Sequence, residues 1–293
     1  LFGISAKYID HLKNENYNSE KLDLSSVKII TSTGSPLAEE SFKYVYENIK
    51  HDVHLASIAG GTDLVGCLVL GNLYSNVHKG EIQGQSLGID VDVFTDNGKS
   101  TKDGDKGELV VKKPFPSMPV KFWGDNDGQK YHKAYFTRFE NIWHHGDFIE
   151  RTSNNGFIMR GRSDSTLNPG GVRIGTSEIY QQVEDIDFIT EGLVVGQDFN
   201  DDVRIILFVT TKNNQKLNDE KVKSIKSRIR INCSPKHVPS LIIQVPAIPR
   251  TKSGKIVELA VRKIIHGEPI DNKGAIANPD VLKYFENLPQ LKL

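Results

Sequence analysis

The strongest constraint on the fold is a strand–helix–strand pattern early in the chain. Residues 27–31 (VKIIT) form a β-branched run, which is typical of a buried strand. Residues 38–49 carry apolar side chains at helical spacing, and 52–58 read as a second strand. Strands that alternate with helices build parallel α/β sheets, so we expect this fold class, with ligands at the loops that follow the strands.

The pattern of strand, turn and helix residues changes at two points further along the chain. Between 79 and 122, short strands alternate with turn dipeptides, which predicts a small antiparallel sheet or barrel. Beyond residue 163, helical and strand patterns alternate in a compact α+β unit, with helices expected at about 176–183 and 219–231. We therefore predict three parts: 1–163, 164–267 and a tail at 268–293.

Bulk composition narrows the classes of function. The chain of 293 residues has 37 basic and 37 acidic side chains, and DNA-binding proteins usually show a basic surplus. No apolar run is long enough to span a bilayer. The two cysteines, Cys67 and Cys233, form no CxxC motif. We expect a cytoplasmic protein without nucleic-acid or membrane partners. Because the chain starts at Leu1 in mid-pattern, we also expect a fragment that lacks an N-terminal portion.

Two loops follow the predicted strands. In the first, Gly34 lets a ligand approach the backbone, and the helix after Ser35 and Pro36 offers unpaired N–H groups. The alternative is a plain strand-to-helix turn with Pro36 near the first helical position. In the second, Thr62 offers a hydroxyl and Asp63 a carboxylate suited to Mg²⁺, although Asp63 could instead cap a helix.

A third candidate is the run WHHGD at 143–147. Asp147 follows a glycine, and its carboxylate can accept two hydrogen bonds from a sugar diol. Adjacent side chains in an extended segment point apart, so we do not expect His144 and His145 to hold a metal together.

Basic side chains of the second half could bind phosphate. Arg162 and Arg173 flank a glycine-rich stretch and could each pair with a phosphate in bidentate fashion. Lys255 follows a glycine and opens a helical pattern, so it could bring a point charge to a phosphate. The alternative is that these are solvated surface charges beside a linker and in a basic loop.

Taken in order, these segments resemble the core motifs of the adenylate-forming superfamily, which contains acyl-CoA synthetases, luciferases and peptide-synthetase adenylation domains. The resemblance implies that 1–163 is the C-terminal portion of a large nucleotide- and acyl-binding domain. It implies that 164–267 is a small mobile α+β domain, hinged at Asp164.

The resemblance also implies ATP, Mg²⁺ and coenzyme A as cofactors. Lys255 and Thr62 would be catalytic, Asp63 would hold Mg²⁺, and Asp147 would bind the ribose. Gly170 and Arg230 would approach coenzyme A after the small domain rotates. The remaining nucleotide contacts implied are Gly34, Ser35, Pro36, Ser57, Ile58, Ala59, Gly60, Gly61, Arg162 and Arg173.

The sequence departs from the superfamily pattern in ways that bear on the substrate. The family's Ser/Thr/Gly-rich phosphate loop is absent, and Asp63 stands where the family has glutamate. Acetate-using relatives carry a tryptophan at the position of Gly60, so we expect the glycine to open space for a longer acyl group.

Stretches such as STGSPL, GGTD and KHVPSLI look like those of synthetases that join acetoacetate to coenzyme A. This similarity implies that acetoacetate, ATP and coenzyme A are converted to acetoacetyl-CoA, AMP and pyrophosphate. The alternatives are a synthetase for another short or branched acyl group, or an incomplete fragment that only binds AMP or coenzyme A.

Overall fold

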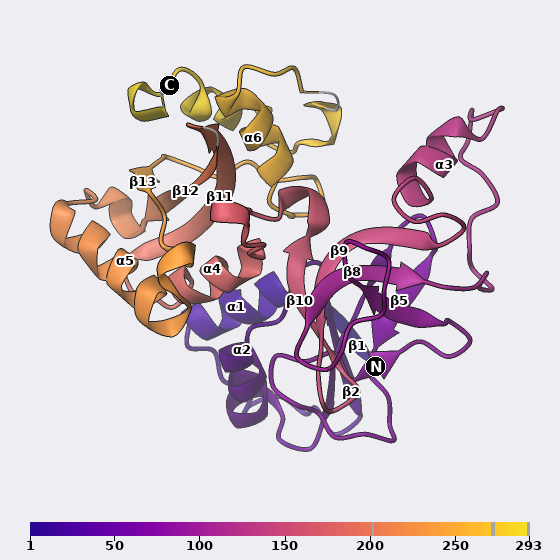
Figure 1. The fold of residues 1–293 in the computed structure, drawn as a ribbon. Helices are drawn as coiled ribbons and strands as arrows, with labels where there is room; N and C mark the ends of the chain where they lie inside the picture. The colour runs from indigo at the N-terminus through magenta and orange to yellow at the C-terminus, as the bar shows by residue number, and fades with distance from the viewer. Residues whose placement is uncertain (201, 271–272, 292–293) are drawn as a thin grey trace. The chain divides into compact units, whose positions relative to one another are not determined.

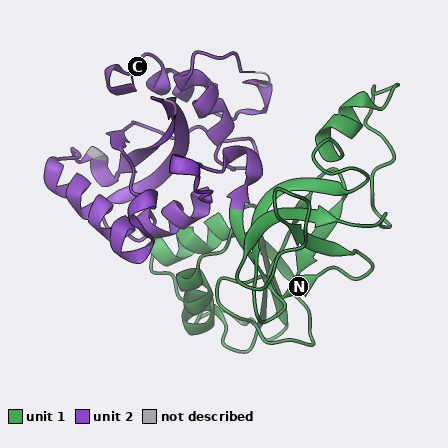
Figure 2. Ribbon diagram, in the orientation of Figure 1, with its two compact units in different colours: residues 1–160 green, residues 161–293 purple. Residues whose placement is uncertain are grey.

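The computed structural model describes residues 1–200, 202–270 and 273–291. Two compact units make up the chain, unit 1 at 1–160 and unit 2 at 161–293 (Figures 1 and 2). Within the described residues, no helix has the length and apolar character needed to cross a membrane.

Unit 1 begins with a parallel three-stranded sheet in the order β1-β2-β3. Its strands are β1 (Phe2–Ser5), β2 (Ile29–Thr33) and β3 (His54–Ser57). The helices are α1 (Ala6–Asn14) and α2 (Glu39–Tyr44), and α2 continues as a π-helix over Val45–Ile49. Residues of these strands and helices share one apolar cluster, which includes Ile30, Phe42 and Leu55. The predicted α/β class is therefore confirmed, while β1 and α1 were not foreseen.

Antiparallel strands form the other sheets of unit 1. One sheet has the order β4-β5-β6, and a four-stranded sheet has the order β10-β9-β8-β7. The prediction of a small antiparallel sheet is correct, but the barrel alternative is wrong, because the described strands form open sheets. The helix α3, which was not predicted, precedes β9. The bounds are β4 Ala59–Gly61, β5 Gly66–Leu70, β6 Gly84–Gln85, β7 Val91–Phe94, β8 Lys106–Val111, α3 Gln129–Tyr135, β9 Trp143–Arg151 and β10 Phe157–Arg162.

Unit 2 is built on a three-stranded sheet in the order β11-β12-β13. The long strands β11 (Ile189–Phe199) and β12 (Asp202–Thr211) are antiparallel, and β13 (Leu241–Gln244) runs parallel to β12. The helices are α4 Thr176–Val183, α5 Asp219–Asn232 and α6 Glu258–Ile265.

Both faces of this sheet are covered, which explains why its strands read as unbroken apolar runs. Side chains that alternate along β12 enter different clusters, with Leu207 on the face of α4 and α5 and Phe208 on the face of α6. The end of the chain joins the second cluster, because Phe285 and Leu291 are buried there and the Phe285 ring meets Phe208 edge-on at 4.8 Å.

Candidate functional site

Two candidate loops leave the same edge of the parallel sheet in unit 1. Ser32 pairs with Ser57, and the N–H of Ile58 donates to the Ser32 carbonyl at 2.9 Å. The loop after β2 turns at Gly34, whose φ of 90° favours glycine, and it leaves Ser35 and Pro36 exposed. The loop after β3 continues directly into β4. Neighbouring parallel strands thus bring both loops to their carboxyl edge, where such sheets bind ligands.

Strand β4 pairs closely with β5 at Gly60. A Cβ atom at this position would lie 2.1 Å from the Gly66 carbonyl oxygen and 2.6 Å from the Cys67 Cα. The space beside Gly60 is therefore filled by the β5 backbone. The prediction that Gly60 opens room for a longer acyl group is wrong, because the glycine is required by the close approach of two strands.

A tight turn follows β4 and presents Thr62 and Asp63 outward. The Thr62 carbonyl accepts from the N–H of Val65 at 3.2 Å, while the Leu64 side chain is fully buried in the core of unit 1. Val65 has a φ of 48°, a left-handed conformation that is strained for a β-branched residue. Strain of this kind concentrates at functional sites and persists only where surrounding structure fixes it.

The Asp63 carboxylate is held by helix α3. The Tyr135 hydroxyl donates a hydrogen bond to Asp63 Oδ2. The start of α3 is fixed in turn by Asp125, whose two carboxylate oxygens accept from the N–H groups of Lys130 at 3.1 Å and Tyr131 at 2.8 Å. The loop residue Asp63 is therefore tied to an anchored helix.

A bulge in strand β9 places Asp147. Glu108 pairs with Phe148 and Val110 pairs with His144, so the single residue between them on β8 faces three residues, His145 to Asp147, on β9. Gly146 absorbs this irregularity with a φ of 82°. Bulges of this kind redirect side chains beside active sites. The two histidines do point apart, as expected, since His144 contacts Glu108 at 2.8 Å and His145 contacts Asp147.

Aromatic rings connect Asp63 with Asp147. The Tyr135 ring stacks on Trp143 with centroids 3.6 Å apart and planes 13° apart. The Trp143 indole N–H donates to His145 Nδ1 at 3.3 Å, so in the neutral histidine the ring proton lies on Nε2. That nitrogen is 3.6 Å from Asp147 Oδ2. The rings of Tyr135, Trp143 and His145 thus connect the two carboxylates. We call these three rings the Tyr–Trp–His bridge.

Sequence reasoning did not find Tyr135 or assign a task to His145. Tyr135 and Asp63 are 72 positions apart, and their contact depends on how α3 lies beside β9 (Figure 1). The residues Ser57, Ile58, Ala59 and Gly61 lie in or between β3 and β4, so Ala59 and Gly61 are strand residues and not the loop residues expected. A Cβ atom at Gly61 would touch the His145 ring at 3.0 Å, so this glycine also has a packing role.

In unit 2, Lys255 lies in a rigid turn. The Thr251 N–H donates to the Lys255 carbonyl at 2.8 Å, and the Lys255 N–H donates back to Thr251 Oγ1 at 3.0 Å. Arg250 clamps the turn by donating to the Gly254 carbonyl at 2.6 Å and to Glu191 at 2.8 Å. The backbone is thus fixed, while the Lys255 residue is exposed.

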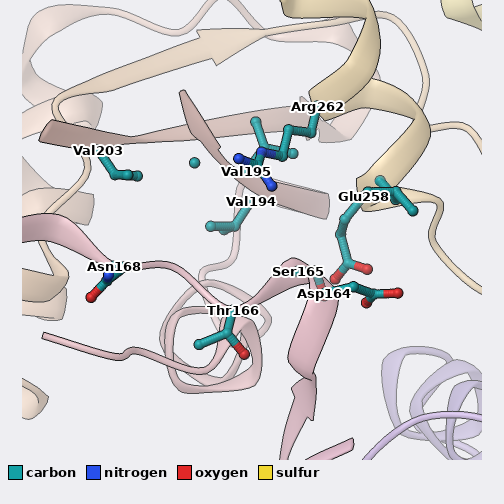
Figure 3. Close-up of a pocket in the computed structure, with 11 residues that line it drawn as sticks. Asp164, Ser165, Thr166, Asn168, Val194, Val195, Val203, Glu258 and Arg262 are labelled. Atoms are coloured by element: carbon teal, nitrogen blue, oxygen red, sulfur yellow. The ribbon is translucent and has the colours of Figure 1, made fainter. Parts of the chain in front are cut away.

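The predicted hinge residue Asp164 lies beside a cavity of about 240 Å³ in unit 2 (Figure 3). Arg162 forms an ion pair with Asp164 at 3.7 Å. Glu258 also lines the cavity, near Asp164 in Figure 3, and accepts hydrogen bonds from Tyr180 at 2.8 Å and Thr176 at 3.3 Å. Burial, reinforced by the charge of Asp164, raises the pKa of the Glu258 carboxyl above its usual value.

The glycine-rich loop at Gly170 is held by the first residue of β12. The Gly170 N–H donates to Asp202 Oδ1 at 2.7 Å, and Gly170 adopts a φ of 56°. Hydrogen bonds from the N–H groups of Gly170 and Val203 lower the pKa of the Asp202 carboxyl. Lys236, which follows α5, reaches the same loop, because a Cβ atom at Gly170 would lie 2.5 Å from its Nζ.

The predicted residues of unit 2 fall on opposite sides of its sheet. Arg230 is exposed on α5, whose Ile225 and Ile229 pack on one face. Lys255 precedes α6, whose Val261 packs on the other face. Arg173 is half-buried just before α4. Within the unit, Lys255 and Arg230 are therefore not parts of one site.

Curated proteins and solved structures resemble this chain over all or nearly all of its length. No protein-family model matches the chain. Curated relatives include an acetoacetyl-coenzyme A synthetase of Rhizobium meliloti, 57% identical over 293 residues, and an acetoacetyl-CoA synthetase of Gallus gallus, 43% identical over 296 residues. Both matches cover 100% of this chain, but 45% and 44% of the relatives.

A solved structure of such a synthetase has the same fold over this chain. Acetoacetyl-CoA synthetase from Streptomyces lividans superposes with a TM-score of 0.90 and 38% identity, over 99% of this chain and 45% of that protein. The chain is homologous to the C-terminal part of acetoacetyl-CoA synthetase. An anthranilate CoA ligase solved with anthranoyl-AMP superposes with a TM-score of 0.73 over 89% of the chain at 18% identity, and it shows the fold alone.

Among the described residues, no group of three or more histidine, cysteine, aspartate or glutamate side chains could enclose a metal ion. Mg²⁺ does not need such a cage, because it is usually bound by one or two carboxylates together with substrate phosphates. The exposed Asp63, with one carboxylate oxygen accepting from Tyr135, fits that mode.

Proposed function

We propose that this chain, as part of the complete protein, catalyses the ATP-dependent ligation of acetoacetate to coenzyme A through an acyl-adenylate. The observation that carries the proposal is the match to a relative named acetoacetyl-coenzyme A synthetase, 57% identical over all 293 residues. The joining of Asp63 and Asp147 through the Tyr–Trp–His bridge supports it.

In the first half-reaction, the acetoacetate carboxylate attacks the α-phosphorus of ATP and pyrophosphate leaves. Negative charge gathers around phosphorus in this step, so the site must supply fixed positive charge. Lys255 supplies it from a turn whose backbone is already fixed. Asp147 accepts hydrogen bonds from the ribose hydroxyls, and Thr62 binds the phosphate of the adenylate. The loop at Gly34, Ser35 and Pro36 lines the adenine side.

Asp63 is the residue that would hold Mg²⁺. When bound, the cation would neutralise charge on the phosphates of ATP. The residue Arg162 contacts the nucleotide in this proposal, and Arg173 acts in the same way.

In the second half-reaction, the coenzyme A thiol attacks the acyl-adenylate and AMP leaves. Unit 2 rotates about Asp164 and exchanges the face that carries Lys255 for the face that carries Gly170 and Arg230. The placement of α5 and α6 on opposite faces of the unit 2 sheet supports this exchange, because a fixed domain could not offer both faces to one substrate.

The proposal is tested with the protein that includes the region preceding this part in its relatives. AMP formation is measured with acetoacetate, acetate and butyrate, each with ATP and coenzyme A. We expect the highest kcat/KM with acetoacetate. A higher value for acetate or butyrate would reassign the substrate, and no AMP with any acid would refute the ligase proposal. The 293-residue chain alone, which lacks a Ser/Thr/Gly-rich phosphate loop, is a control expected to release little pyrophosphate.

A further inference from the structure

The contact between Tyr135 and Asp63 has features of a built positioning device. The hydroxyl of Tyr135 meets one carboxylate oxygen of Asp63, and the Tyr135 ring is fixed by stacking on the buried Trp143. Edge contacts with Phe122 and Tyr131, with centroids 5.9 and 5.8 Å away, complete its surroundings. A ring held from several sides has little rotamer freedom, so its hydroxyl occupies a defined point.

We propose that Tyr135 is a positioning residue that orients the Asp63 carboxylate toward the metal of MgATP. This inference rests on the proposed adenylation activity and adds a residue to it. An ionised carboxylate is an acceptor with two oxygens. Because Oδ2 accepts the hydrogen bond from the Tyr135 hydroxyl, Oδ1 is directed elsewhere and serves the cation.

The strained turn makes such an external anchor necessary. Asp63 is an exposed residue in a turn that also contains the strained Val65, and its side chain would otherwise sample several rotamers. A hydrogen bond to a charged acceptor is among the stronger kinds and fixes direction as well as distance. The Tyr–Trp–His bridge also reaches Asp147, so the same aromatic cluster borders the carboxylate proposed to face the ribose.

The test compares Tyr135→Phe with Tyr131→Phe in the complete protein. Both variants remove one hydroxyl from α3, and the Tyr131 hydroxyl donates to the Pro119 carbonyl at 2.5 Å instead of to Asp63. Calorimetric titrations with MgATP and with metal-free ATP in EDTA give the two dissociation constants. For Tyr135→Phe we expect the MgATP constant to rise about 10-fold, with the metal-free constant unchanged. For Tyr131→Phe we expect neither to change.

The other outcomes distinguish failure of the positioning role from failure of the proposed function. If Tyr135→Phe weakens MgATP and metal-free ATP equally, or behaves like Tyr131→Phe, the positioning role is refuted while the ligase proposal stands. If the unsubstituted protein binds no MgATP, the proposed function itself fails. A double-mutant cycle with Asp63→Asn adds a second check, because the Tyr135 effect on MgATP binding must vanish once the carboxylate is gone. An undiminished effect would overturn the inference.

Discussion

The replacement Gly60→Ala tests the close approach of β4 and β5. The added Cβ would lie 2.1 Å from the Gly66 carbonyl oxygen, whereas carbon–oxygen contacts between strands are usually about 3.3 Å or more. The strands must therefore separate by roughly 1 Å at this point. Such a shift disturbs a pairing that extends only from Ala59 to Gly61 on β4.

The expected loss of stability is large for a single methyl group. Overpacking costs about 1–3 kcal/mol, and a clash with backbone atoms places Gly60→Ala at the upper end. For a domain of this size, about 3 kcal/mol corresponds to a fall in Tm of roughly 6–12 °C. The neighbouring glycine gives a matched control, because a Cβ at Gly66 would lie 3.4 Å from Leu64 Cδ1, an ordinary contact.

Thermal unfolding of both variants, followed by calorimetry, measures the difference. We expect Gly66→Ala to remain within a few degrees of the unsubstituted protein and Gly60→Ala to fall well below it. Equal melting temperatures would refute the reasoning and would show that space beside Gly60 is open after all.

Three further predictions concern unit 2. Phe285→Ala should lower the free energy of unfolding by about 3–5 kcal/mol in denaturant titration, because it empties a buried site against Phe208. Because the pKa of Glu258 is raised in the folded protein, its stability contribution is complete below the carboxyl's unfolded pKa and is lost as pH rises through the folded pKa. The stability of Glu258→Gln relative to the unsubstituted protein should therefore grow with rising pH. Parallel curves of stability against pH would contradict this prediction. Asp202→Ala should free the Gly170 N–H and slow thioester formation from supplied acyl-adenylate, with adenylation unchanged in a pyrophosphate-release assay.

Local patterns predicted much of the fold. The helix over 176–183 coincides with α4, where Glu178 accepts from the Gly175 N–H at 2.9 Å. The helix over 219–231 is recovered as α5, which Asn218 caps through the Lys221 N–H. Periodicity and caps are encoded locally, so a single sequence suffices for them.

Features that depend on long-range contact could not be read in this way. Strand β1 is four residues long and mostly exposed, so its pattern is weak until it pairs with β2. The prediction for Gly60 came from the tryptophan of acetate-using relatives, but the close approach of the β5 backbone is what requires a glycine at this position. The contact of Tyr135 with Asp63 likewise requires the tertiary fold. The role of each of these residues depends on tertiary packing, which the spacing of residues in the sequence does not reveal.

The most direct test of the central claim is the effect of Lys255→Ala on the two half-reactions of the complete protein. Removing one preorganised charge contact costs about 10²- to 10³-fold in rate, so pyrophosphate release with acetoacetate and ATP should fall by that factor. Acetoacetyl-CoA formation from supplied acetoacetyl-adenylate and coenzyme A should keep its rate, because the turn with Lys255 and helix α5 with Arg230 lie on opposite faces of unit 2. Equal losses in both half-reactions would contradict the account.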